Sequence, residues 1–188
     1  QQFDYRLNGV LFDTSGTSSI TKIGSANLTL GGMNRHAQGT ALNEGSITVA
    51  TDSALGTGTL GMANGTTLRT AVNAGRSTNA ENVVVTNAIT TAGAGTISTA
   101  TGLTLITSTG VISGAGSLVK TGDGLLVLNG ANTYSGGTAL NGGTIRVGNN
   151  AAFGTGAVTA AARTMVQAGL PGVNLATNFT LNGEMLVD

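Results

Sequence analysis

The stretch Gly114–Val158, GAGSLVKTGDGLLVLNGANTYSGGTALNGGTIRVGNNAAFGTGAV, decides how the rest of the chain is interpreted. It is rich in glycine and alternates apolar residues with small polar ones. An offset of 98 positions aligns Ser19–Leu60 with Ser117–Val158 without a gap, and 19 of the 42 aligned residues are identical. An internal repeat of this kind indicates an array of stacked units, so we expect an extended scaffold.

The composition favours an aliphatic, β-rich fold. Of the 188 residues, 40% are hydrophobic, only 3% are aromatic, 9% are charged and 31 residues are glycine. Disordered chains combine low hydrophobicity with high net charge, and this chain has neither property. Glycine interrupts every window of helical length, whereas strand-like segments with apolar residues two positions apart recur throughout.

Charge and cysteine content exclude several classes of function. Eight basic residues balance eight acidic ones, so no excess charge attracts nucleic acid or an anionic membrane. The chain has no cysteine and therefore no disulfide or thiolate site. Its longest apolar runs, Leu125–Leu128 and Val83–Val85, are too short to span a bilayer as helices.

The spacing of the strand-like segments predicts the architecture. Their representative apolar residues are Phe12, Leu30, Val49, Leu68, Val85, Leu105, Leu128, Val147, Val166 and Leu181. The steps are roughly 15 to 23 residues, whereas an antiparallel meander would turn about every 8 to 12. We therefore expect an all-β parallel β-helix of about nine coils, forming one segment over residues 1–188. The strand-like start at Gln1 suggests a fragment of a longer protein.

The two copies indicate which side chains point inward. In Asn27–Leu30 only Leu28 and Leu30 are apolar, so their counterparts Leu126 and Leu128 should lie inside, leaving Leu125 and Val127 outside. By the same alternation, inward positions are Ile47, Val49, Ile145 and Val147, and solvent-facing ones are Thr48 and Arg146. Matched glycines are expected at corners: Gly24 and Gly122, Gly45 and Gly143, Gly56 and Gly154.

The second copy resembles the passenger-associated repeat of bacterial autotransporters. The residues that carry the resemblance are Gly116, Leu118, Lys120, Gly122, Gly124, Leu126, Leu128, Gly130, Asn132-Thr133-Tyr134, Gly136-Gly137-Thr138, Gly143-Thr144, Val147 and Gly154. The first copy departs from this pattern, with Asn34-Arg35-His36 and Gln38 in place of Asn132-Thr133-Tyr134 and Gly136. Copy 19–60 is therefore interpreted as a diverged repeat and copy 117–158 as a clear one.

This resemblance implies a secreted passenger with a right-handed parallel β-helix, exported through a C-terminal outer-membrane barrel of the parent protein. Such passengers act as adhesins or as stalks that hold a functional head away from the cell. The expected location is the bacterial cell surface or outer membrane, or the secreted fraction. Expected partners are host-cell or matrix molecules or neighbouring bacterial cells, with no nucleic acid.

Four residues are candidates for surface recognition: Tyr134, Leu125, Val127 and His36. Tyr134 is expected at an exposed corner, although it is equally interpretable as a packing element of the bend. Leu125 and Val127 would form a small apolar stripe, either a binding patch or a surface beneath a loop. His36, the only histidine, is expected at a surface corner rather than in a catalytic triad.

No catalytic, cofactor-binding or metal-binding residue is predicted, and the chain is not expected to be an enzyme. Gly56–Gly61 has dinucleotide-binding glycine spacing, but no helix follows it to bind the phosphates. A β-helical polysaccharide-cleaving enzyme is an alternative, because stacking of coils could bring together acidic residues that are far apart in the sequence. These acids are Asp4, Asp13, Glu44, Asp52, Glu81, Asp123 and Glu184. A passive spacer for a missing head is the third hypothesis.

The ends of a β-helix expose strand edges that offer unpaired backbone groups. End-to-end self-association of the chain is therefore expected.

Overall fold

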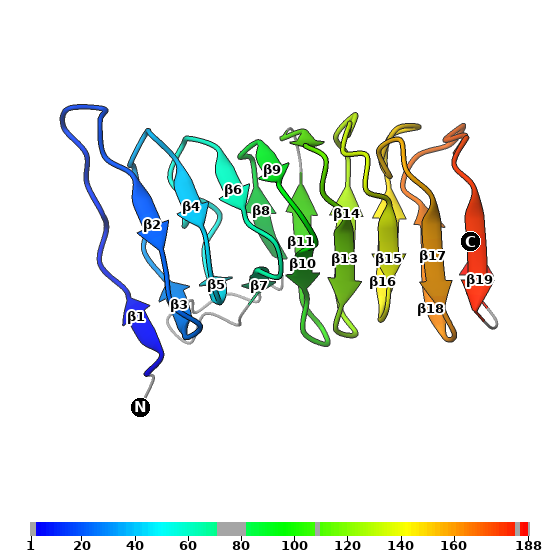
Figure 1. Ribbon diagram of the computed structural model, residues 1–188, viewed down its shortest axis with the longest axis horizontal. Coiled ribbons are helices and arrows are strands. Elements are labelled where there is room, and N and C mark those ends of the chain that lie inside the picture. Colours follow the sequence, from blue (N-terminus) through cyan, green and yellow to red (C-terminus); the bar gives the residue numbers. More distant parts are fainter. Residues whose placement is uncertain (1–2, 71–81, 108–109, 183–184, 188) are drawn as a thin grey trace.

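The computed structural model describes residues 3–70, 82–107, 110–182 and 185–187, and the regular structure within these ranges consists of strands alone. The strand pairings are all parallel. Strands follow one another along the long axis in sequence order, as the colours in Figure 1 show. The all-β parallel β-helix predicted from the sequence is confirmed, with about eight turns rather than nine.

Three parallel sheets, named here A, B and C, run along the rod. Sheet A contains β1 (Tyr5–Leu7), β3 (Asn27–Leu30), β5 (Ser46–Val49), β7 (Thr67–Thr70), β10 (Gly95–Ser98), β13 (Leu118–Thr121), β15 (Thr138–Leu140), β17 (Val158–Ala161) and β19 (Phe179–Asn182). Sheet B contains β2 (Ile20–Lys22), β4 (Thr40–Leu42), β6 (Leu60–Met62), β9 (Ile89–Thr91) and β12 (Ile112–Ser113). Sheet C contains β8 (Asn82–Val85), β11 (Thr104–Thr107), β14 (Leu125–Leu128), β16 (Thr144–Val147), β18 (Thr164–Ala168) and β20 (Met185–Val187).

The core is a set of columns in which inward-pointing side chains, most of them aliphatic, stack from coil to coil. In sheet A the register aligns Ile47 with Leu68, Leu68 with Ile97, and Ile97 with Lys120. Ile47, Leu68 and Ile97 are fully buried, because alternate residues of each short strand point into the rod. The expected inward residues Leu30, Val49, Leu126, Leu128, Ile145 and Val147 are also buried, and Leu28 is partly buried against this core.

The chain turns at glycines whose φ angles are positive. All six expected corner glycines have φ between +66° and +75°. At Gly122 (φ +75°) a Cβ atom would lie 2.2 Å from the Thr99 carbonyl oxygen of the preceding coil. The corner therefore needs glycine both for its backbone conformation and for the close approach of the neighbouring coil.

Equivalent strands of the two repeat copies lie on different faces of the rod. The strand Asn27–Leu30 belongs to sheet A, whereas its counterpart Leu125–Leu128 belongs to sheet C. From β8 to β13 each turn of the chain places one strand in every sheet, whereas each repeat copy consists of two turns that each have two strands followed by a loop. The second copy therefore starts one face further round the axis.

Several expectations from the sequence need correction. The representative strand residues were expected to be equivalent, but Leu30 and Leu68 lie in sheet A and Leu105 in sheet C. Residues 10–12 form no strand, and sheet A instead begins with β1. Thr48, expected in solvent, is buried on the outer face of the sheet, where its hydroxyl donates a 2.8 Å hydrogen bond to Asn27 Oδ1. Arg146 is half-buried.

Substitution of two glycines with the same φ separates backbone strain from steric clash. Gly102 also has φ +75°, but nothing lies within 4 Å of a Cβ atom placed there. We expect Gly102→Ala to lower the free energy of unfolding by about 1 kcal/mol. Gly122→Ala should lower it by about 3 kcal/mol or more, because coil backbones must separate as well. Urea unfolding followed by circular dichroism measures both, and equal losses would contradict the close-approach argument.

Candidate functional site

A buried lysine anchors the same corner in both repeat copies. Lys120 is fully buried, and its Nζ donates hydrogen bonds to the carbonyl oxygens of Thr121 (2.9 Å), Gly122 (2.6 Å) and Gly142 (3.1 Å). Lys22 Nζ donates the matching hydrogen bonds, to the carbonyl oxygens of residues 23, 24 and 44. Burial lowers the pKa of Lys120 to about 8, an effect opposed by the nearby negative charge of Asp123. The ammonium group thus satisfies carbonyls from two successive coils.

A buried asparagine joins three successive coils in each copy. Asn132 Oδ1 accepts the Ile112 backbone N–H at 2.8 Å, and its Nδ2 donates to the Ala152 carbonyl at 2.6 Å. Asn34 makes the corresponding bonds to Leu11 N and to the Ala54 carbonyl. Because the side-chain amide offers both a donor and an acceptor, it connects the loop to the coils on either side.

Two residues after this asparagine, an aromatic side chain enters the core and binds a threonine hydroxyl. Tyr134 is fully buried, and its hydroxyl lies 2.5 Å from Thr138 Oγ1. Burial raises the pKa of Tyr134 to about 12, against the opposing hydrogen bond with Thr138. His36 occupies the same place in the first copy, with Nε2 at 2.9 Å from Thr40 Oγ1. The His36–Thr40 and Tyr134–Thr138 pairs are therefore equivalent. Together with the buried lysine and asparagine of each copy, they are called the framework residues below.

The hydrogen-bond partners of Thr40 indicate which ring nitrogen of His36 carries a proton. Thr40 Oγ1 donates to the Leu55 carbonyl at 3.2 Å, so it accepts its second bond from the Nε2–H of His36. His36 Nδ1 is buried and has no hydrogen-bond partner among the described residues. Burial lowers the pKa of His36, while the Leu55 backbone and the charge of Asp13 oppose this shift.

The surface corner expected for His36 is wrong, whereas for Tyr134 the alternative interpretation as a packing element is confirmed. Tyr134 is 0% exposed and His36 is 2% exposed, because both side chains fill the core beneath a loop. Val127 points outward but is only 4% exposed, since it lies in register between Ile106 and Arg146 on the outer face of sheet C. Leu125 is partly exposed beside them. Asn34 and His36 are two residues apart in the sequence, and so are Asn132 and Tyr134. This spacing could have indicated that the His36 and Tyr134 side chains point inward.

The described acidic side chains mostly cap backbone amides. Asp13 accepts bonds from the amides of Ser15, Gly16 and Ser18, which together hold the pKa of its carboxyl far below the usual range. The other such bonds run from Asn27 N to Asp4, from Gly24 N to Glu44 and from Val84 N to Asp52. Among the described residues, no three His, Asp or Glu side chains gather to hold a metal. Glu81 and Glu184 lie outside the described residues.

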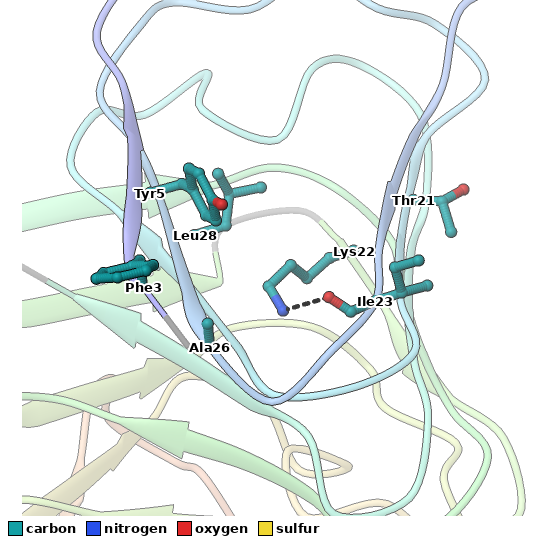
Figure 2. Close-up of a pocket in the computed structure, with 7 residues that line it drawn as sticks. All are labelled: Phe3, Tyr5, Thr21, Lys22, Ile23, Ala26 and Leu28. Atoms are coloured by element: carbon teal, nitrogen blue, oxygen red, sulfur yellow. Dashed lines mark hydrogen bonds between the residues drawn. The ribbon is translucent and has the colours of Figure 1, made fainter. Parts of the chain in front are cut away.

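The N-terminal end of the rod has a cavity of about 340 Å³. Figure 2 shows Lys22 lying in it between Leu28 and Tyr5 of sheet A and Ile23 of the corner that follows β2. Phe3, Tyr5 and Ile23 are well exposed there. The corner of Lys22 is therefore open to solvent on one side, whereas β10 and β15 flank β13, the strand that holds Lys120.

A second cavity, of about 690 Å³, lies on the side of the first coils. We call it the Phe12–Arg35 groove; its lining residues are Val10, Phe12, Met33, Asn34, Arg35, Ser53 and Thr57. The Arg35 guanidinium lies over the Phe12 ring at 5.7 Å from the ring centroid, a cation–π arrangement. Sequence reasoning missed this groove because it places Phe12 in a strand, whereas residues 10–12 form no strand and line the groove together with residues of later coils.

Comparison with protein families agrees with this geometry. A family model described as passenger-associated-transport-repeat matches residues 20–49 and 118–147, the two segments that carry the buried lysine, asparagine and aromatic residue. Each of the two copies thus matches this repeat family. The resemblance of the chain to an autotransporter passenger with β-strand repeats is confirmed. Searches of the curated proteins and of the solved structures gave no match.

Passenger-associated-transport-repeats imply a secreted or surface-exposed location. In the described part of the chain, no helix is long and apolar enough to cross a membrane.

Removal of the buried ammonium group should destabilise the clear transport repeat. Lys120→Met leaves three carbonyls without their donor, and we expect the free energy of unfolding to fall by about 3 kcal/mol. Lys22→Met should lower the free energy of unfolding by less, because water in the adjoining cavity can bind the freed carbonyls. Urea unfolding of both variants measures the difference. A larger loss for Lys22→Met would contradict the assigned role of the cavity.

The diverged transport repeat should be sensitive to acid. The unfolded chain binds a proton at His36 more readily than the folded chain, so stability should fall as the pH drops below the ordinary histidine pKa of 6.5. His36→Tyr copies the other repeat and should abolish this loss between about pH 7.5 and about pH 5.5. The reciprocal Tyr134→His should add a second acid-sensitive site. Melting temperatures at both pH values test this, and an unchanged pH dependence in His36→Tyr would refute it.

Proposed function

We propose that this chain is a non-catalytic, surface-exposed segment of an autotransporter passenger that serves as an adhesin or stalk in cell adhesion or virulence. The observation that supports it best is the pair of passenger-associated-transport-repeats built into one continuous rod. Parallel stacking makes a rigid element that presents side chains along its length. The rod would stand at the bacterial cell surface or outer membrane, or be released, after export by the C-terminal outer-membrane barrel of the parent protein.

An adhesive role is supported over that of a bare spacer by the unequal surfaces of the rod. Exposed large hydrophobic side chains gather towards the N-terminal end, at Phe3, Tyr5, Leu7, Val10, Phe12, Ile23 and Met33. Exposed apolar groups of this kind are typical of interaction sites. The proposed partners are host-cell or matrix molecules or neighbouring bacterial cells.

Binding of the whole 188-residue chain to cells and matrix tests the proposal. We expect saturable binding of the fluorescently labelled chain to epithelial cells, to matrix-coated wells or to bacterial cells, with displacement by unlabelled chain. A β-solenoid of similar size and charge, without the N-terminal apolar side chains, is the control. Absence of saturable binding on all three surfaces would contradict adhesion and leave the spacer role.

The oligomeric state has to be measured in the same samples. The edges of β1 and β19 at opposite ends of sheet A offer unpaired backbone groups, so end-to-end association is also proposed. Association would raise apparent affinity through multivalency. Sedimentation velocity over a range of concentrations identifies the monomeric samples in which adhesion is then compared.

A further inference from the structure

The Phe12–Arg35 groove combines exposed apolar side chains with one guanidinium group. Val10, Phe12 and Met33 are 55%, 66% and 58% exposed, values far above those of the core residues beneath them. Arg35 is exposed and contacts the Phe12 ring. The only fully buried lining residue, Asn34, has both its amide groups bound to backbone. The groove therefore offers apolar contact and a cation, with few further hydrogen-bonding groups.

The second transport repeat provides an internal comparison for this groove. Leu11 N and Ile112 N bind the equivalent asparagines, so Phe12 corresponds to Ser113. The 98-residue offset pairs Met33 with Ala131 and Arg35 with Thr133.

The framework residues beneath these positions keep their roles. Asn34 and Asn132 make the same bonds, and so do the His36–Thr40 and Tyr134–Thr138 pairs. Three exposed side chains change, from small ones in the clear copy to large apolar or cationic ones in the diverged copy: Phe12, Met33 and Arg35. Val10 corresponds to Val111, a valine that is also exposed. Folding needs none of these large side chains, since the clear copy has the same framework without them.

Arg35 has no carboxylate partner among the ion pairs and hydrogen bonds of the described residues. Two acids are adjacent in sequence to lining residues, Asp13 and Asp52. Asp13 has both carboxylate oxygens bound to the amides of the 15–18 turn, and Asp52 accepts a hydrogen bond from the Val84 amide. A guanidinium beside apolar surface is suited to a carboxylate, which it binds with paired N–H donors. Arg35 thus remains available to an incoming anion.

We propose that the Phe12–Arg35 groove binds an acidic segment of a partner protein, with a carboxylate side chain on Arg35 and an adjacent apolar side chain against Val10, Phe12 and Met33. This proposal rests on the adhesive function and names its site. A protein segment fits better than a glycan, because the lining side chains offer only Arg35, Ser53 and Thr57 for a ligand's hydroxyl groups. Sugar sites need more such groups.

Fluorescence polarisation with labelled ten-residue peptides tests the proposal. The probes are alternating leucine–glutamate, leucine–glutamine and leucine–lysine peptides, all added to the whole chain. We expect the leucine–glutamate peptide to bind with a Kd of about 10 to 100 μM and the leucine–glutamine peptide about fivefold more weakly. The leucine–lysine peptide should not bind, because Arg35 repels it.

Variants that copy the second transport repeat locate the binding site. Arg35→Thr and Met33→Ala install the residues of the clear copy, so the fold is kept, and each should weaken the leucine–glutamate peptide about fivefold or more. Arg69→Thr removes an equal charge from the exposed outer face of sheet A and should leave binding within about twofold. Circular dichroism confirms that every variant retains its strands.

The other outcomes decide against the proposal or against the adhesive function on which it rests. Equal binding of the glutamate and glutamine peptides, no binding up to about 1 mM, or unchanged binding by Arg35→Thr would overturn it. Binding of sialyllactose in place of the peptide would overturn it and assign the groove to acidic sugars. Cell adhesion that persists in Arg35→Thr refutes the groove alone. Peptide binding by a chain that does not adhere to cells refutes the adhesive function alone.

Discussion

Parallel pairing between successive coils, as in the register that joins Leu28 to Ile47 and Ile47 to Leu68, limits what this rod can contain. Every coil between the two ends of the rod has another coil's backbone at strand spacing on both sides. Side chains directed into the rod must therefore match those above and below them, which accounts for the aliphatic columns. The same spacing leaves no room for a Cβ atom at corners such as Gly122, where the Thr99 carbonyl approaches.

Backbone groups at the corners cannot take part in the sheets, and the repeat supplies side chains for them. The Lys120 ammonium binds three carbonyls, and the Asn132 amide joins the coils on either side. Each of these groups replaces hydrogen bonds that water would otherwise provide. The repeated lysine and asparagine are thus explained by backbone geometry, without a ligand or a reaction. The exposed positions between them carry no such requirement and are free to diverge.

The sequence predicts the parallel β-helix, the inward residues of the strands and the corner glycines, because each depends on local alternation or on a positive φ. It does not predict the face on which a strand lies. Leu28 and Leu126 are identical and both point inward, yet they belong to different sheets, since that assignment depends on every strand between the copies. Burial of His36 and Tyr134 was missed because the residues two positions before them are asparagines, whose polarity does not mark a position as inward-facing. The Phe12–Arg35 groove depends on stacking between residues far apart in the chain.

The rotation of the second copy by one face has a consequence for valency. Two transport repeats on one face would present the loops of both copies to the same flat surface, and a receptor array could engage both at once. Here the loop that follows β3 lies along sheet C, whereas the loop that follows β14 lies along sheet B beside Ile112. Because the two loops lie on different faces of the rod, a flat surface that contacts one loop does not contact the other. Repetition in this rod therefore adds length without adding a second contact, and strong attachment to a surface would require several rods side by side.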